Sequence, residues 1–398
     1  MTDLLSVTDA HARLIALFAP LDIEEVPLAA AAGRVLARDV VATRAQPPFA
    51  ASAMDGYAIQ WADLVQGARL AVVGAAHAGA RFEGQVEPGE AVRILTGAPV
   101  PEGADTVLIQ EDVERDGDWI LVRAASDRGP NIRAAAADFA AGACLAAPLR
   151  IGPAEMALLA AMNAGRVATR RRPVVALIPT GDELVTPGEE PGPDQIVCST
   201  SYGLKAMLDA AGAEARILPI ARDTARSLTA AFDLAEGADL IVTLGGASVG
   251  DLDLVRATAL AEGLALEFHR IAMRPGKPLM AGRLRGTPLV GLPGNPVSAM
   301  ICGHLFLVPA VAAMLGLPAG LPPLLRGRLD TALTPNGPRA HFMRARVTEE
   351  ADGRRCHVLA RQDSSLLTEL AAANALVMRP PGDPARRIGD TVEFSWFS

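Results

Sequence analysis

Between residues 173 and 315 the sequence alternates between apolar segments that fit buried strands and segments with helical spacing. The strand-like segments are "PVVALIPTG", "ARILPI", "ADLIVTLGG" and "TPLVGLPGNP". Apolar strands that alternate with helices predict a parallel, doubly wound sheet. Ligands of such sheets bind beyond the carboxyl ends of the strands. The sequence therefore predicts that a site, if there is one, lies in the loops after these strands.

The remaining segments follow other patterns, and 398 residues are too many for one ordinary core. Residues 45–140 hold short β-like runs between Gly, Pro and Asp turns, and helix signals occupy the N-terminal segment and residues 151–166. We expect a multidomain α/β plus β fold: a discontinuous N-terminal domain in which the two helices pack together, an inserted β-rich domain, the α/β domain and a small C-terminal β-barrel domain. The expected boundaries are 1–44 with 141–171, 45–140, 172–322 and 323–398.

Charge and cysteine usage argue against several classes of function. The net charge is -8 and the one dense basic block is "RRR" at 170–172, so we expect no nucleic-acid partner. An anionic small molecule stays compatible with this balance, because local charge decides its binding. The four cysteines are scattered without a C-x-x-C pair, which indicates single reduced thiols in a cytoplasmic protein and no zinc cluster.

We expect no membrane association. The N-terminus carries acidic residues and lacks the basic start of a signal peptide. The most apolar stretch, residues 298–317, contains His304 and Pro309, and we interpret it as a buried helix rather than a membrane span.

Carboxylates recur in the loops that follow the strands. "GGASVGDLD" joins a glycine turn, which suits an anion, to Asp251 and Asp253. "PTGDEL" supplies Asp182 and Glu183, and Asp223 follows "ARILPI". A helix-start carboxylate is the ordinary alternative for the Asp182–Glu183 pair. Acids gathered at one sheet edge would repel each other unless a cation lay between them, and Mg²⁺ binds a few carboxylates together with phosphate oxygens. The pattern predicts a magnesium site there.

Two further loops carry features that suit an anion. In "RIAMRPGKPLMAG", Arg270, Arg274 and Lys277 lie around a stiff Pro-Gly turn, which favours phosphate or an oxyanion such as molybdate. A solvated basic loop is the alternative. In "GLPGNPVS", Asn295 is the expected N-cap and Pro296 the first helical residue, so the helix start offers free amides. An ordinary strand-to-helix turn explains that pattern equally well.

Three stretches in the β-rich region carry weaker signals. "SAMDGYA" contains Asp55 in an Asp-Gly turn, "LTGAPVPEGADTV" contains Thr96 after a strand, and "NIRAAAADF" contains Asp138 in an alanine run. Each pattern alone is more typical of a structural turn than of a functional site.

Taken together, these stretches resemble the MoeA family, the molybdopterin molybdenumtransferases, which includes the gephyrin E domain. The motifs that carry the resemblance occur in order over most of the chain: "SAMDGYA", "LTGAPVPEGADTV", "PTGDEL", "GGASVGDLD", "RPGKP" and "GLPGNPVS". The resemblance implies a four-domain subunit with an α/β domain of the molybdopterin-binding type. It also implies a homodimer in which the β-rich domain of one subunit faces the α/β domain of the other.

The implied reaction joins molybdate to adenylylated molybdopterin, with Mg²⁺-assisted release of AMP. Carried over residue by residue, the resemblance implies catalytic roles for six residues: Asp55, Thr96, Asp138, Glu183, Asp223 and Asp253. Three of these are expected to hold the metal: Glu183, Asp223 and Asp253. The residues expected to bind the pterin nucleotide or molybdate are Gly245, Gly246, Ser248, Arg270, Arg274, Lys277, Pro293, Asn295, Pro296 and Ser298. The molybdopterin adenylyltransferase is an expected docking partner.

The chain departs from the family pattern at a few positions. Ala50 and Ala51 replace the usual Asp-Asn before "SAMDGYA", Ala136 and Ala137 replace Gly-Glu before Asp138, and Thr200 stands in an Asn-containing turn. These changes leave open a molybdopterin-binding paralogue with weakened or altered metal insertion. A non-enzymatic scaffold is a second alternative. A third is the adenylyltransferase reaction, whose enzymes share the α/β part but lack the front domain.

Overall fold

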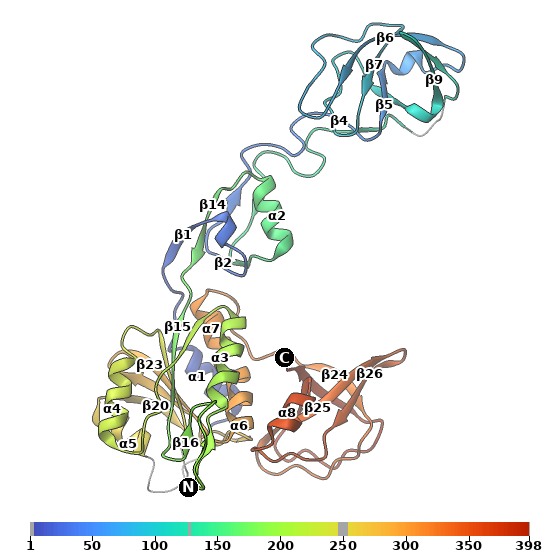
Figure 1. Cartoon of the computed structure of the whole chain (residues 1–398). Coiled ribbons are helices and arrows are strands. Elements are labelled where there is room, and N and C mark those ends of the chain that lie inside the picture. Colours follow the sequence, from blue (N-terminus) through green and yellow to red (C-terminus); the bar gives the residue numbers. More distant parts are fainter. Residues whose placement is uncertain (1–3, 126–128, 246–253, 398) are drawn as a thin grey trace. The chain divides into compact units, whose positions relative to one another are not determined.

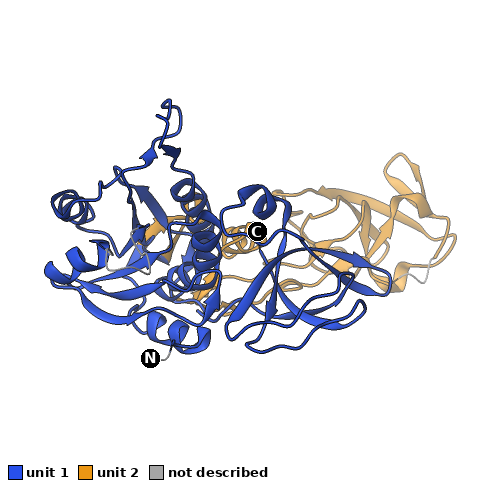
Figure 2. Ribbon diagram, turned by 90° about the horizontal axis from the view of Figure 1, so that it is seen from below, with its two compact units in different colours: residues 1–24, 33–37, 169–398 blue, residues 25–32, 38–168 orange. Residues whose placement is uncertain are grey.

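The computed structural model describes residues 4–125, 129–245 and 254–397 of the chain. These residues form two compact units, which Figure 2 shows in different colours. Unit 1 takes residues 1–24, 33–37 and 169–398, and unit 2 takes residues 25–32 and 38–168. The bounds of these two units differ from the four domain boundaries expected from the sequence, and those boundaries stay a prediction.

The α/β part of unit 1 is built on one six-stranded sheet of order β18-β15-β19-β23-β22-β20. The strands are β18 (Glu214–Ile217), β15 (Val174–Pro179), β19 (Leu240–Leu244), β23 (Thr287–Leu292), β22 (Met280–Leu284) and β20 (Ala265–His269). The first four are parallel, as the sequence predicts. β22 runs antiparallel to both of its neighbours. It joins β23 through the two-residue turn Arg285–Gly286, and both residues have the positive φ that a tight hairpin needs.

Helices cover both faces of this sheet, which confirms the doubly wound fold (Figure 1). Val175 and Leu177 of β15 pack in one core with α1 (Val7–Ile15), α3 (Thr200–Ala211) and the helix that begins at Pro296. Ala176 and Ile178 face the other core, with α4 (Ala225–Leu234) and α5 (Leu254–Ala261). The helix α1 is therefore part of the α/β core. The expectation that it packs on the second helix is wrong in this respect, because α2 (Pro153–Ala161) belongs to unit 2.

The long apolar helix consists of α6 (Pro296–Cys302), the π-helical turn η4 (Gly303–Leu307) and α7 (Val308–Met314). It is the one helix in the described part of the chain that is long and apolar enough to span a membrane. Its mean hydropathy is 1.9, but 72% of that window is buried inside the protein. Packing against the sheet accounts for its apolar character, in agreement with the interpretation as a buried helix.

The C-terminal segment forms a closed barrel of order β25-β26-β24-β28-β27, in which β27 also pairs with β25. Its strands are β24 (Leu325–Leu329), β25 (Ala340–Glu350), β26 (Gly353–Val358), β27 (Ala375–Arg379) and β28 (Thr391–Trp396). The short strand β21 (Met273–Arg274) adds to β25, and α8 (Leu367–Ala372) precedes β27. Phe342, Leu370, Leu376 and Phe397 of this segment belong to the same core as α1 and α7. The predicted C-terminal barrel is confirmed, and it shares a core with the α/β part.

Unit 2 contains a six-stranded sheet of order β8-β5-β7-β6-β10-β9. The strands are β5 (Gly56–Ile59), β6 (Arg69–Ala76), β7 (Glu90–Ile94), β8 (Thr106–Ile109), β9 (Val113–Asp116) and β10 (Trp119–Val122). Unit 2 also contains two separate antiparallel strand pairs: β4 (Ala51–Ser52) with β11 (Ile132–Arg133), and β3 (Val40–Val41) with β12 (Cys144–Leu145). The short β-like runs predicted for this region include "RLAVVG", "EAVRIL", "DTVLIQ" and "WILVRA", and each of these four contains a strand.

A four-stranded sheet joins segments that are far apart in the sequence. Its order is β1-β14-β2-β13, with β1 (Ile23–Pro27), β14 (Arg166–Arg170), β2 (Val35–Leu36) and β13 (Leu149–Arg150). Strands from the N-terminal segment thus alternate with strands that follow the β-rich region. This pairing confirms a discontinuous N-terminal domain with an insertion.

Candidate active site

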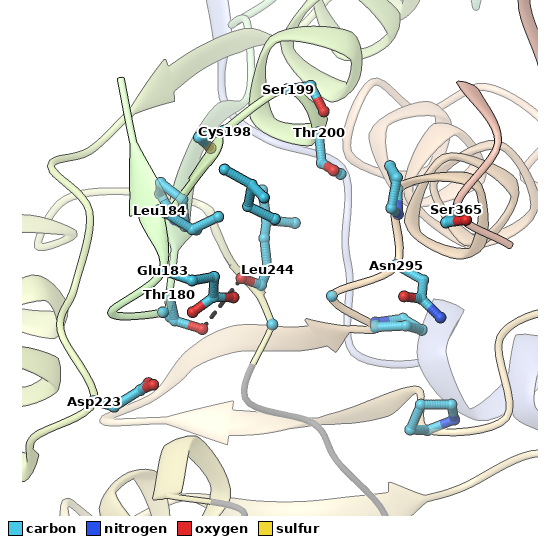
Figure 3. A pocket seen from close by; sticks show the side chains of 18 of the residues that line it. Thr180, Glu183, Leu184, Cys198, Ser199, Thr200, Asp223, Leu244, Asn295 and Ser365 are labelled. Atoms are coloured by element: carbon cyan, nitrogen blue, oxygen red, sulfur yellow. Dashed lines mark hydrogen bonds between the residues drawn. The ribbon is translucent and has the colours of Figure 1, made fainter. Parts of the chain in front are cut away.

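A cavity of about 1230 Å³ opens at the carboxyl ends of β15, β19 and β23. Figure 3 shows Glu183, Asp223, Asn295 and Ser365 around it. The loops after three neighbouring parallel strands supply most of its wall, which is the place that the doubly wound topology predicts. The cavity therefore brings together loops that lie more than 100 residues apart in the sequence.

The loops after β15 and β19 touch at Gly245, which has a φ of 102°. A Cβ at this residue would lie 2.7 Å from the carbonyl oxygen of Thr180 and 2.9 Å from its Oγ1. The Thr180 hydroxyl in turn donates to the carbonyl oxygen of Leu244 at 3.1 Å. Both the backbone conformation and the close approach require glycine at this position.

Glu183 and Asp223 both line the cavity. The carboxylate of Glu183 lies over Gly181, which has a φ of 144°, and its Cδ is 2.7 Å from where a Cβ of Gly181 would be. The backbone N–H of Asp223 donates to Oδ1 of Asp182 at 3.1 Å, so the two acidic loops are linked. Within the described ranges, neither the Glu183 nor the Asp223 carboxylate accepts a hydrogen bond from the protein. Both oxygen pairs are free to bind a ligand.

The basic loop divides between two cavities. Lys277 and Pro278 line the large cavity, whereas Arg274 lines a second hollow of about 340 Å³ with His341 and Arg379 of the barrel. Burial and the nearby guanidinium groups, Arg274 first among them, lower the pKa of His341 to about 4. Arg270 lines neither cavity and has a φ of 73°. Of the three predicted cations, Lys277 therefore lines the same cavity as the two acids.

The helix after β23 begins at Pro296, and Asn295 takes the N-cap position, both as predicted. The Asn295 side chain makes no capping bond and donates instead to Oγ of Ser364 at 2.9 Å. The backbone N–H of Val297 donates to the Ser364 carbonyl oxygen at 3.1 Å. One of the amides that were expected to be free for an anion at this helix start therefore already has a partner in the C-terminal segment. Asn295 and Pro296 line the cavity together with Pro293, whereas Ser298 is buried outside the lining.

The C-terminal segment adds residues that the sequence pattern did not indicate. Ser365 and Leu367 line the cavity from beyond the end of the α/β domain. Arg222, next to Asp223, donates through Nη1 to three carbonyl oxygens of the Glu183 turn. No local signal marks these residues, because their partners are backbone atoms or lie far along the chain.

A separate acidic site lies in unit 2, where Asp55 precedes β5. The backbone N–H and the hydroxyl of Thr96 donate to Oδ1 of Asp55 at 2.7 and 2.8 Å. These bonds, the backbone one first, and the nearby Arg93 lower the pKa of Asp55. The pairing of Asp55 with Thr96 joins two motifs that are 41 residues apart. Neither residue lines the large cavity, whose lining residues all belong to unit 1.

Asp138 is also part of unit 2 and is exposed. Its backbone N–H donates to the carbonyl oxygen of Gln46 at 3.0 Å. Ala136, two residues earlier, has a φ of 61°, in the left-handed region that favours glycine. The departure from the family's Gly-Glu sequence therefore falls at a strained position.

Gly246, Ser248 and Asp253 lie outside the described residues, so their predicted roles stay predictions. In the part of the chain that the structure describes, no group of three or more His, Cys, Asp or Glu side chains could hold a metal ion. Glu183 and Asp223 remain a pair of acids at one cavity. Mg²⁺ commonly binds through one or two carboxylates and completes its shell with water and substrate phosphates, and such a pair fits that mode.

Models of known families match most of the chain. The MoeA N-terminal region (domain I and II) matches residues 5–163, a probable molybdopterin binding domain matches residues 176–313, and the MoeA C-terminal region (domain IV) matches residues 326–397. These ranges contain the unit 2 site, the cavity loops and the barrel in turn.

Individual proteins with the same domains are similar over most of their length. The molybdopterin molybdenumtransferase of Nostoc sp. is 35% identical, with 91% of this chain and 86% of the relative covered. Molybdopterin molybdenumtransferase 2 of Mycobacterium tuberculosis is 37% identical over 82% of this chain and 84% of the relative. The crystal structure of a molybdopterin biosynthesis MoeA protein from Pyrococcus horikoshii covers 100% of both chains, with a TM-score of 0.83 and 30% identity.

Proposed function

Because the chain belongs to the MoeA family, we propose that it is a molybdopterin molybdenumtransferase that joins molybdate to adenylylated molybdopterin and releases AMP with the help of Mg²⁺. Molybdate and the pterin nucleotide are its substrates. The observation that carries the proposal is the cavity at the strand ends, whose lining includes one lysine and two acids that accept no hydrogen bond from the described residues.

Glu183 and Asp223 are the residues that would hold Mg²⁺, together with Asp253 from the sequence pattern. When bound, Mg²⁺ would neutralise phosphate charge and stabilise the charge that develops as the phosphoanhydride breaks. The acids have no other task in the described part of the fold, since no protein donor satisfies them.

The other residues of the cavity bind and orient the anions. Lys277 supplies a positive charge for the molybdate or for a phosphate group of the pterin nucleotide. Gly245 and Gly294 have no side chain and let a bound group approach the backbone between two strand ends. Asn295 and Ser365 close the far wall with polar groups that can hydrogen-bond a pterin or a phosphate.

A homodimer is the proposed assembly. In it, Asp55 of the partner subunit completes the cavity, with Thr96 keeping that carboxylate ionised and fixed. The molybdopterin adenylyltransferase is a proposed docking partner that delivers the nucleotide. The reaction is proposed to take place in the cytoplasm, where the four free thiols described by the structure stay reduced.

The direct test is AMP release, measured by chromatography after mixing the purified protein with adenylylated molybdopterin, Mg²⁺ and molybdate. We expect AMP in amounts that depend on both Mg²⁺ and molybdate. Absence of AMP with folded dimeric protein would favour the scaffold alternative. Adenylyl transfer from ATP to molybdopterin, which we do not expect, would favour the adenylyltransferase alternative.

A further inference from the structure

The turn that carries Glu183 is held by bonds to its backbone carbonyl groups. The carbonyl oxygen of Glu183 itself accepts the N–H of Ile196 at 2.8 Å, from strand β17 (Ile196–Val197). The carbonyl oxygens of Gly181, Asp182 and Leu184 all face one donor, Nη1 of Arg222, at 3.4, 3.0 and 3.2 Å. All four carbonyl groups of the turn therefore have partners, and a single guanidinium group serves three of them.

Arg222 and Asp223 come from the loop that follows β18, on the far side of β15 from β19. The Asp223 N–H donates back to Oδ1 of Asp182 at 3.1 Å, so the loops are tied in both directions. The Arg222 N–H is itself fixed by Oγ of Ser227 at 2.9 Å, in the first turn of α4. This chain of bonds links the helix start to the backbone on both sides of Glu183.

Arg222 is an exposed residue, and among the described residues no carboxylate lies within 4.0 Å of its guanidinium group. An exposed arginine with no acidic partner adds little to stability by ion pairing. Its hydrogen bonds instead hold the backbone of the turn that carries Glu183. They therefore fix the position of the Glu183 carboxylate relative to Asp223.

We propose that Arg222 is a positioning residue that holds the Glu183 turn and the Asp223 loop at the spacing needed to share one divalent cation. This inference rests on the proposed function. Arg222 does not line the cavity, so it acts through the two acids and not on the substrate. The loss of such supporting contacts typically weakens metal binding by about 10- to 100-fold.

The test uses the purified full-length chain with Mn²⁺ as a probe for Mg²⁺, in the presence of AMP, with free Mn²⁺ measured by electron paramagnetic resonance. Arg222→Met removes the donors and keeps an unbranched apolar side chain in place of the arginine stem. Arg222→Lys keeps the charge but not the planar fork. Arg226→Met is the matched control, because Arg226 is exposed in the first turn of α4 and the substitution removes the same charge. Hydrogen exchange of the amides at 181–185 reports on the turn itself.

We expect Arg222→Met to weaken Mn²⁺ binding by about 10-fold, to speed exchange at 181–185 and to leave the melting temperature close to that of Arg226→Met. The Mn²⁺ affinity and the exchange rate of Arg222→Lys should lie between those of Arg222→Met and Arg226→Met. With the reaction mixture, the Mg²⁺ concentration for half-maximal AMP release should rise in Arg222→Met while saturating Mg²⁺ restores most of the rate.

Equal Mn²⁺ affinity and equal exchange in Arg222→Met and Arg226→Met would overturn the inference. Failure of the proposed function gives a different result, since the wild-type chain would then release no AMP. In that case exchange at 181–185 still decides whether Arg222 holds the turn. If Arg222→Met does not fold, Arg222→Lys against Arg226→Lys decides the same question.

Discussion

The acids of the two units are prepared in different ways. Asp55 of unit 2 already accepts two hydrogen bonds from Thr96, and its pKa is lowered by them. Glu183 and Asp223 of unit 1 accept none from the described residues, although their backbones are firmly tied. One carboxylate is satisfied by the protein before any ligand arrives, whereas the other two are positioned and left open. Asp55 is therefore an acid whose negative charge the protein itself stabilises, whereas Glu183 and Asp223 are available as metal ligands.

The largest expected effect comes from removing a charge at the open acids. Glu183→Gln or Asp223→Asn should lower the rate of AMP release by about 100-fold, because the charge that would hold the cation at the breaking bond is lost. The rate is measured with saturating Mg²⁺ and molybdate. Glu190→Gln is the control, as Glu190 is exposed, lies seven residues after Glu183 and lines neither cavity. Full turnover in both acid variants would remove them from the site.

Gly181→Ala tests whether the position of Glu183 matters apart from its charge. An alanine there should cost about 1–3 kcal/mol of the free energy of unfolding because of its φ, and its Cβ should also displace the Glu183 carboxylate. Gly188→Ala is the matched control, since Gly188 has a φ of 97° with nothing within 4 Å of an added Cβ. Both variants should lose stability in urea melts, but AMP release should fall only in Gly181→Ala. Equal AMP release by Gly181→Ala and Gly188→Ala would show that the position of the Glu183 carboxylate does not matter for the reaction.

Thr96→Val removes one of the two donors to Asp55 and keeps the shape of the side chain. The pKa of Asp55 should rise towards its ordinary value, as measured by carboxyl NMR titration. A carboxyl group whose pKa is lower in the folded state than in the unfolded state stabilises the fold at pH values above the unfolded-state pKa. This stabilisation is lost as the pH falls through the folded-state pKa. The variant should therefore be less stable than the wild type at neutral pH and equal to it in acid. Thr96→Ser, which keeps both donors, should behave like the wild type at every pH.

The smallest expected effect concerns the strained backbone near Asp138. Ala136→Gly should raise the free energy of unfolding by about 0.5–1 kcal/mol, since relief of the left-handed conformation outweighs the added freedom of the unfolded chain. Ala137→Gly, at a residue without positive φ, should lower it. Thermal melts of the two variants give the comparison. A loss of stability in both would show that the turn tolerates alanine without strain.

Sequence reasoning identified the sheet and the cavity loops because strand ends in a parallel sheet must share an edge. The strand ends therefore predict Glu183, Asp223 and Asn295 at one edge, whereas Lys277 is predicted from the stiff Pro-Gly turn and the family resemblance. Sequence reasoning did not anticipate that β22 runs antiparallel, because the segment was interpreted as a loop around the Pro-Gly turn. The signal for a hairpin, Arg285–Gly286, is a weaker turn pair than Asn-Gly or Asp-Gly.

The remaining differences arise from contacts that leave no local pattern. Arg274 and Lys277 are three residues apart, but Arg274 is part of β21 and pairs with the barrel, whereas Lys277 follows that strand. The bonds of Arg222 end on carbonyl oxygens, which every residue has, so no residue type reveals them. Ser364 reaches Asn295 across 69 residues of chain, a distance that only the tertiary fold closes.

The shared core of the barrel and the α/β part has a consequence for how the chain can be divided. Phe342, Leu376 and Phe397 pack with the apolar helix, and the Ser364 carbonyl oxygen accepts the N–H of Val297, the first amide after Pro296. A shortened chain that stopped before β24, near residue 320, would expose these faces to water and open one wall of the cavity. Fragments of unit 1 should therefore aggregate when expressed alone. The barrel cannot be exchanged between relatives unless the helix surface that it packs against is exchanged with it.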